Sequence, residues 1–251
     1  MRQEWRKSAG RKGALMRMSL YGNPGTAAGR RLGGLRSLQS HAKLNTRFKT
    51  LIPIRIPRYS VRLAELLGIL MGDGHVSEYQ ISITTNSETD RDHARFTANL
   101  IYEIFGLPAR QRLRKDCKAV EILLSSKAAC TFIARIGMPQ GNKLKHGLVP
   151  PDWIYKSPRY KHAFLRGLID TDGTVYRDCH IINHRSYAST CIAFTSASSE
   201  LRAFVKKSWL ELGYHATVSG RDVRLRRKAD VLGYAKTIGF NNPKHSRKIT
   251  V

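Results

Sequence analysis

Two aspartates stand at matching points of this chain and are the residues best suited to chemistry. Asp73 lies within Gly72-Asp73-Gly74 and Asp172 within Thr171-Asp172-Gly173, each directly after a stretch with the helical spacing of apolar residues. A carboxylate at a helix C-terminus opposes the helix dipole, so an ordinary cap more often carries lysine or asparagine. Two structural caps are the simpler alternative, but the same unfavourable choice made twice indicates a function for both acids.

A metal-ion site is the chemistry that such a pair of carboxylates favours. Placed side by side, two carboxylates repel each other unless a cation lies between or beside them. Oxygen donors suit hard divalent ions, so we expect Mg²⁺ as the cofactor, with Mn²⁺ able to substitute. Gly72 and Thr171 directly precede the two acids and join them as candidate metal-site residues.

Small residues predict how the two acids come together. Gly68 and Gly72 are four residues apart, as are Gly167 and Thr171, so each pair lies on one face of its helix. Small side chains on such a face let two helix backbones cross closely. We therefore expect the two helices to pack on each other through Gly68 and Gly167 and to place both carboxylates side by side.

Each acid belongs to a pattern of elements that occurs twice. The first copy predicts a helix through 63–70 ending at 72–74, a strand over 80–84, a helix ending at 106, strands over 109–115 and 118–124, and a helix over 128–136. The second copy predicts a helix over 161–171, strands over 174–176, 180–183 and 191–195, a helix over 199–212, strands over 216–219 and 222–226, and a helix to 238. Ser87, with Asp90 three residues later, is the predicted N-cap of the second helix.

This duplication predicts an α+β fold, within the broad α/β class. Two tandem αββαββα repeats with antiparallel sheets would be related by a pseudo-two-fold axis, and one chain would act as a monomeric internal pseudo-dimer. The predicted boundaries are a basic arm at 1–60, a first repeat at 61–148, a linker at 149–158 and a second repeat at 159–251.

The predicted arm holds half of the net charge of the protein. Residues 1–60 contain fourteen Lys or Arg and a single acid, Glu4, whereas the whole chain carries +26. Apolar residues are sparse there, so we expect a segment that is flexible when free and that adds affinity for phosphates. A tail without any role is the alternative.

The overall charge indicates a polyanionic partner. Lysine and arginine supply the salt-dependent part of nucleic-acid affinity, although a basic ribosome-associated protein would share this composition. None of the four cysteines forms a C-x-x-C pair, which argues against a zinc site or a disulfide framework. Without a signal peptide or a long apolar run, we expect a cytoplasmic, nucleoid-associated or organellar protein that is not secreted.

The two acid-bearing nonamers resemble a known motif. Residues 66–74 (LLGILMGDG) and 165–173 (LRGLIDTDG) are similar to the LAGLIDADG signature of homing endonucleases, here in the single-chain form with two motifs. The resemblance extends over roughly residues 60–248 and implies that the two repeats form a pseudo-two-fold saddle whose antiparallel sheets bind DNA. It implies a site-specific endonuclease that makes a staggered double-strand break in a long DNA target by Mg²⁺-dependent phosphodiester hydrolysis, with Asp73 and Asp172 as catalytic metal ligands.

The same resemblance implies a lysine after the third helix of each repeat. The matching residues are Lys143 and Lys244, which we predict to be catalytic, with Lys145 as a rival for the first position. Simple phosphate contact is the alternative role for all three. Asp170 occupies the motif's other acidic position, where the first copy has Met71, so we expect Asp170 to be structural.

Polar side chains on the predicted strands indicate base recognition. A two-stranded ribbon fits the major groove and reads base edges with alternate residues. An exposed face that is polar only for solubility is the alternative. The predicted DNA-binding residues are Gln80, Ser82, Thr84, Arg110, Gln111, Arg112, Arg114, Lys115, Arg221, Arg224 and Arg226.

Other functions remain open for such a fold. An RNA maturase that binds intron RNA, or a non-catalytic DNA-binding protein, can dispense with the acids, and the presence of both favours the enzyme. An intein is a third possibility. Because the chain lacks an initial Cys or Ser and ends in Lys-Ile-Thr-Val, we expect a freestanding, intron-encoded protein acting on double-stranded DNA.

Overall fold

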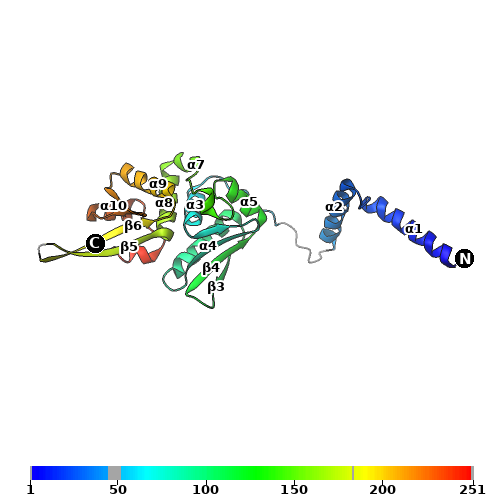
Figure 1. The fold of residues 1–251 in the computed structure, drawn as a ribbon, viewed down its shortest axis with the longest axis horizontal. Coiled ribbons are helices and arrows are strands. Elements are labelled where there is room, and N and C mark those ends of the chain that lie inside the picture. Colours follow the sequence, from blue (N-terminus) through cyan, green and yellow to red (C-terminus); the bar gives the residue numbers. More distant parts are fainter. Residues whose placement is uncertain (1, 45–51, 183, 250–251) are drawn as a thin grey trace. The chain divides into compact units, whose positions relative to one another are not determined.

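The computed structural model describes residues 2–44, 52–182 and 184–249, and these fall into two compact units that divide between Leu51 and Ile52 (Figure 1). The first unit contains two helices, α1 (Arg2–Tyr21) and α2 (Ala27–Lys43). Thr26 caps α2, because its side chain accepts a hydrogen bond from the backbone N–H of Gly29. Two helices thus occupy most of the predicted basic arm, whose flexibility in the free protein stays a prediction, while residues 45–51 of the arm lie outside the described residues.

The second unit contains the two repeats (Figure 1). The first is α3 (Val61–Asp73), β1 (Gly74–Val76), β2 (Gln80–Asn86), α4 (Arg91–Phe105), β3 (Arg110–Leu113), β4 (Ala119–Ser125), α5 (Lys127–Arg135) and the short α6 (Lys143–His146). After α7 (Asp152–Tyr155), the second is α8 (Pro158–Asp172), β5 (Gly173–Ile182), β6 (Arg185–Thr195), α9 (Ser199–Glu211), β7 (Ala216–Ser219), β8 (Asp222–Leu225), α10 (Lys228–Thr237) and α11 (Pro243–Ser246). The duplicated αββαββα order is confirmed.

Both repeats build the same sheet. The strand orders are β1-β2-β4-β3 and β5-β6-β8-β7, and every paired strand is antiparallel. Alternate residues of β2, such as Ile81 and Ile83, are buried against the helices, while Ser82 and Thr84 lie on the opposite face. The predicted α+β class with two antiparallel sheets is confirmed.

The core of the second unit is continuous across both repeats. Helices α3 and α8 pack on each other at its centre, where Leu66, Leu70, Leu165 and Ile169 are fully buried. Such an apolar sequence on nearly every side of a helix indicates that it is enclosed by other elements. The two acids therefore end the two helices that pack on each other at the centre of this core.

Two segments assigned to the arm and linker are part of this core. Trp153 of α7 is buried, donates from its indole N–H to the Ile136 carbonyl at 2.9 Å, and stacks on Tyr59 at 4.5 Å between ring centroids. The Tyr160 hydroxyl donates to the Tyr59 carbonyl. The boundary of the basic arm thus lies near residue 51 instead of 60, and residues 149–158 are anchored by packing.

Two local predictions are wrong. Helix α4 begins at Arg91 with Asp90 as its N-cap residue, and Ser87 lies before it. The separate strands expected over 174–176 and 180–183 are one long strand, β5, because its pairing with β6 continues without a break. Asn183, the last residue of that prediction, lies outside the described residues. Within the described part of the chain, none of the helices is long and apolar enough to cross a membrane.

Candidate active site at the paired helix ends

Helices α3 and α8 end in the same way. Each is followed by a glycine in extended conformation, Gly74 and Gly173, whose backbone N–H donates to the carbonyl of Leu70 or Ile169. A Cβ at Gly74 would lie 2.7 Å from the Leu70 carbonyl oxygen, so the sharp exit from helix to strand requires glycine. Both acids consequently stand at the junction between a central helix and the first strand of its sheet.

Close contact between the helices brings the two ends together. A Cβ on Gly68 would collide with the Phe164 carbonyl oxygen, and one on Gly167 would collide with the Glu65 carbonyl oxygen. A Cβ on Gly72 would collide with the Thr171 side chain and lie 3.6 Å from the Asp172 carboxyl carbon. Gly68 and Gly167 therefore lie where α3 and α8 approach each other closely, and Gly72 extends this contact to the acids.

The two carboxylates share one electrostatic environment. Burial, and after it the charge of Asp73, raises the pKa of Asp172 from 3.8 to about 7, although Lys143 opposes both effects. Burial likewise raises the pKa of Asp73, against the charges of Lys143 and Lys244. Burial of both carboxylates, together with the charge of Asp73 acting on Asp172, disfavours their ionised forms, as expected for groups that a cation would stabilise.

Lys143 reaches the end of the first helix. Its Nζ donates to the carbonyl oxygens of Met71 at 3.0 Å and Gly74 at 2.9 Å, and also to that of Gly72. Burial lowers the pKa of Lys143, although Asp172 and Asp73 act in the opposite direction. Lys145 is exposed on the same short helix, so the geometry favours Lys143 over Lys145 as the lysine of this site.

Lys244 approaches from the second repeat but has a different partner. Its Nζ lies 2.8 Å from the Asp90 Oδ1, and its charge also acts on Asp73. Asn142 caps α6 and Asn242 caps α11, so Lys143 is the first residue of its helix, whereas Lys244 is the second. The two lysines therefore reach the acids from inequivalent positions.

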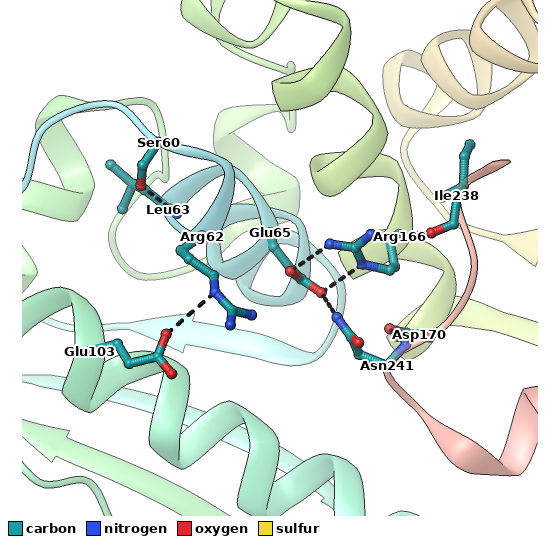
Figure 2. Close-up of polar contacts among 9 residues, drawn as sticks. All are labelled: Ser60, Arg62, Leu63, Glu65, Glu103, Arg166, Asp170, Ile238 and Asn241. Carbon is teal, nitrogen blue, oxygen red and sulfur yellow. Dashed lines mark hydrogen bonds and ion pairs between the residues drawn. The ribbon is translucent and has the colours of Figure 1, made fainter.

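A buried polar network supports the second repeat's helix end (Figure 2). The Arg166 guanidinium donates to both Glu65 carboxylate oxygens, at 2.9 and 2.8 Å, and to the Ile238 carbonyl, while the Asn241 side chain also donates to Glu65. The Asp170 Oδ2 accepts from the Asn241 backbone N–H at 2.9 Å, and burial raises the pKa of Asp170 to about 7. Asp170 is thus held within the protein, which agrees with its predicted structural role.

The donor set at the helix ends fits a divalent metal ion. Two carboxylates of raised pKa offer hard oxygen ligands and gain most from a cation, and Mg²⁺ typically binds one or two protein carboxylates together with waters and substrate phosphates. The Thr171 hydroxyl is committed elsewhere, since it donates to helix carbonyls of α8. Of the residues predicted to form the metal site, Asp73 and Asp172 would therefore hold such an ion through their carboxylates.

The first sheet presents a polar surface beside the acids. Cross-strand pairing places His75, Ser82, Leu123 and Arg110 in one row, and Thr84, Glu121 and Arg112 form the next row. Gln80 lies on the same face, where its amide donates to the Ser125 hydroxyl.

Gln111 and Lys115 depart from the predicted surface. Gln111 pairs with Ile122, whose side chain faces the helices, so Gln111 lies on the opposite face from Arg110 and Arg112. This follows from the alternation of side chains along a strand. Lys115 lies beyond the end of β3, which is Leu113, in the turn before β4.

Glu121 pairs with two of the predicted DNA-binding arginines. Its carboxylate is almost fully buried and accepts from Arg112 Nε at 2.9 Å and from Arg114 Nε at 2.8 Å. These bonds and charges lower the pKa of Glu121. The excess of arginine over acid on this strand is therefore smaller at the surface than the sequence suggested.

In the second sheet the predicted residues are dispersed. Arg224 shares a face with Asp222, and its Nη2 donates to the Asp222 Oδ2 at 2.6 Å. Arg226 lies just after β8, with its Nη2 3.9 Å from the Asp178 Oδ2. Arg221 is exposed in the turn between β7 and β8. Only Arg224 belongs to the strand surface itself.

A comparison with known families identifies the second repeat. Residues 159–239, which include Asp172, match the family model described as LAGLIDADG-like domain. The second repeat is a LAGLIDADG domain. The first repeat has the same sheet order and carries its own acid-bearing nonamer, so the chain has the two-motif arrangement.

A solved structure has the same fold as both repeats. A variant of the homing endonuclease I-DmoI, in complex with its target DNA and in the presence of manganese, matches 73% of this chain and 97% of its own chain. The TM-score is 0.50 and the sequence identity 19%, so this likeness describes the LAGLIDADG fold alone.

Curated relatives share only a segment with this protein. The chain is 28% identical over 220 residues, 78% of its length, to the tRNA-splicing ligase RtcB of Methanopyrus kandleri, of which it covers 21%. It is 28% identical over 184 residues, 71% of its length, to the replication factor C small subunit of Methanocaldococcus jannaschii, of which it covers 10%. The chain thus spans about a tenth to a fifth of the curated relatives it matches.

Several residues of this LAGLIDADG site were not predicted from the sequence. His75 and Thr174 follow the acids on the polar faces of their sheets, and each is exposed. Their position two residues after an acid was visible in the sequence, although their direction was not. The partners of Glu65, and two of the partners of Asp90, come from the other repeat, and no local signal indicates such contacts.

Proposed function

We propose that this protein is a site-specific DNA endonuclease that cuts both strands of a long target by metal-dependent phosphodiester hydrolysis. The observation that carries the proposal is the pair of half-buried carboxylates, Asp73 and Asp172, at the crossing of α3 and α8 with Lys143 beside them. The polar sheet surfaces adjoin this pair, so a duplex lying on them would bring its phosphates to the acids.

The residues of this chain divide the proposed reaction between them. Asp73 and Asp172 would hold the metal, which supplies positive charge and a polarised water when bound. Lys143 would stabilise the negative charge that develops on the phosphate. A water attacks phosphorus, the bond to the 3′ oxygen breaks, and that oxygen leaves with a proton, which yields a 3′ hydroxyl and a 5′ phosphate. Lys244 would serve the second strand from the other repeat.

Selection of cut sites from a plasmid library tests this function directly. The purified protein is incubated with plasmids carrying randomised inserts and Mg²⁺, and the ends of linearised molecules are sequenced. We expect one long motif cut at fixed positions on both strands, and Asp73→Asn or Asp172→Asn should nearly abolish cutting while leaving DNA binding largely intact. Specific binding without any cleavage would instead support a non-catalytic DNA-binding protein on this fold.

The curated relatives favour a second candidate for how a protein with this activity is encoded. Proteins named as a tRNA-splicing ligase and as a replication factor each share a segment with this chain over a small part of their length. A segment common to proteins of such different names is best explained as a module whose activity is its own. This favours a LAGLIDADG module embedded in host proteins over the freestanding, intron-encoded form expected from the sequence.

A further inference from the structure

Asp90 has an unusual position for a buried acid. It is the N-cap residue of α4, where an aspartate normally accepts hydrogen bonds from the first backbone N–H groups of the helix. Its side chain makes no such bond. The side chain is nevertheless buried, with only 4% of its surface exposed. Asp90 stands at a capping position but does not cap the helix. Capping therefore does not explain why its carboxylate is buried.

Contacts from the second repeat supply that reason. The Asp90 Oδ1 accepts from the side-chain amide of Asn242 at 2.8 Å and lies 2.8 Å from the Lys244 Nζ, while its Oδ2 accepts from the Thr85 hydroxyl at 2.9 Å. Asn242 is fully buried and also donates to the Asp170 carbonyl at 3.1 Å. Asp90 of the first repeat therefore fixes the start of α11, which carries Lys244.

The contacts of the two lysines differ. Lys143 is bound by carbonyls at the end of α3, whereas the Lys244 Nζ lies beside the Asp90 carboxylate at the start of α4. Each lysine is therefore held at its own place by its own set of groups. A free lysine side chain samples many rotamers, and holding its ammonium in one place removes the need to order it during reaction.

We infer that Asp90 is a positioning residue for Lys244, and that it controls cleavage of one DNA strand without contributing to DNA affinity. This inference rests on the proposed endonuclease function. The opposite strand depends on Lys143, which is bound by carbonyls of α3 and makes no contact with Asp90. Loss of Asp90 should convert the enzyme into one that nicks predominantly a single, constant strand.

Single-turnover cleavage of a duplex labelled on each strand tests the inference. Asp90→Asn should slow cutting of one strand about tenfold to a hundredfold, leave the other within about twofold, and leave DNA affinity in calcium unchanged. Lys244→Met should slow the same strand. In the Lys244→Met background, Asp90→Asn should have no further effect, because a residue that acts only through Lys244 has nothing left to position.

Two further variants separate positioning from folding. Asp230→Asn removes another buried aspartate, which accepts from the His215 backbone N–H far from the acids, and should leave the strand ratio unchanged. Thr85→Val keeps the Asp90 charge but removes its hydroxyl partner, and should slow the same strand by about threefold, less than Asp90→Asn. It tests the inference even where Asp90→Asn unfolds.

The outcomes distinguish this inference from the proposed function. Wild-type protein that cuts no DNA overturns both. Wild-type cleavage with equal slowing of both strands in Asp90→Asn and Thr85→Val, or additive effects of Asp90→Asn and Lys244→Met, overturns the positioning role alone.

Discussion

Replacing Asp172 with asparagine should stabilise the metal-free protein while removing the proposed activity. Burial and then the charge of Asp73 raise the pKa of Asp172 from 3.8 to about 7, although Lys143 opposes them. In the unfolded chain the carboxyl keeps its ordinary pKa. At neutral pH the folded state must therefore either bury the charge of this carboxylate or bind a proton, whereas the unfolded chain keeps the carboxylate charged in water.

The sign and size of this stability change follow from the linkage between proton binding and folding. A carboxyl with a raised pKa binds its proton more tightly in the folded state, so its penalty is absent below about pH 4, grows towards pH 7 and is complete above it. Each pKa unit is worth about 1.4 kcal/mol, which gives a full penalty of about 4 kcal/mol. Asparagine cannot ionise but remains a half-buried polar group, so Asp172→Asn should gain about 2 to 4 kcal/mol at pH 8. In a protein of this size, that raises Tm by roughly 5 to 15 °C.

Thermal unfolding of both proteins between pH 5 and pH 8, in buffer with a chelator, measures the effect. The Tm of Asp172→Asn should exceed that of the wild type by more as the pH rises. Asp73 and Asp170 also have raised pKa values, but both proteins contain them, so comparing the two proteins at each pH removes their contributions. Added Mg²⁺ should narrow the difference, because the wild-type protein has both carboxylates to bind it.

Asp90→Asn is the matched control, because the same change from aspartate to asparagine should lower the stability there instead of raising it. Burial raises the pKa of Asp90, but hydrogen bonds from Lys244, Asn242 and Thr85 more than offset it, so the pKa is lowered overall. Asp90→Asn should therefore lose stability at pH 8, and the loss should shrink as the pH falls below 4. A lower Tm for Asp172→Asn than for the wild type at pH 8 would refute the reasoning.

Four further results are expected. Gly167→Ala should cost about 3 kcal/mol of stability in chemical denaturation, because the new methyl group meets backbone of the facing helix, whereas Gly10→Ala meets open space. Lys143→Met should slow cleavage about a hundredfold in single-turnover assays, with little effect from Lys145→Met. Glu121→Gln should release two arginines, which strengthens non-specific binding and steepens its logarithmic salt slope by about one per new phosphate contact in titrations. Deletion of residues 1–51 should weaken DNA binding and flatten that slope without moving the cut position, as end-sequencing of products would show.

The duplicated fold could be read from the sequence because its signals are local. Apolar spacing identified α3 and α8, and the glycines that follow the acids mark sharp exits from helix to strand. Gly68 and Gly167 predicted the close crossing of the two helices. Each is followed four residues later by another small residue on the same helix face, which lets two helix backbones approach closely. Both acids and the expectation of a metal followed from this arrangement.

The directions in which surface side chains point, and the residues that they contact, could not be predicted from the same sequence patterns. Gln111 has the polarity of its neighbours Arg110 and Arg112, but strand alternation turns it to the other face of the sheet. The counter-charge of Arg112 and Arg114 comes from Glu121 on the adjacent strand. Pairing register between strands decides such contacts, and register depends on the whole sheet.

The sequence alone determined the repeat, the central helices and the two acids, because each depends on residues within one or two turns of chain. Only the tertiary structure showed that Asp90, which resembles part of a helix cap, binds Lys244 more than one hundred and fifty positions later. It also showed that Lys143 and Lys244 reach the acids from different helix positions. Contacts between repeats are made when two separately patterned halves pack together, and no local spacing records which side chains then meet.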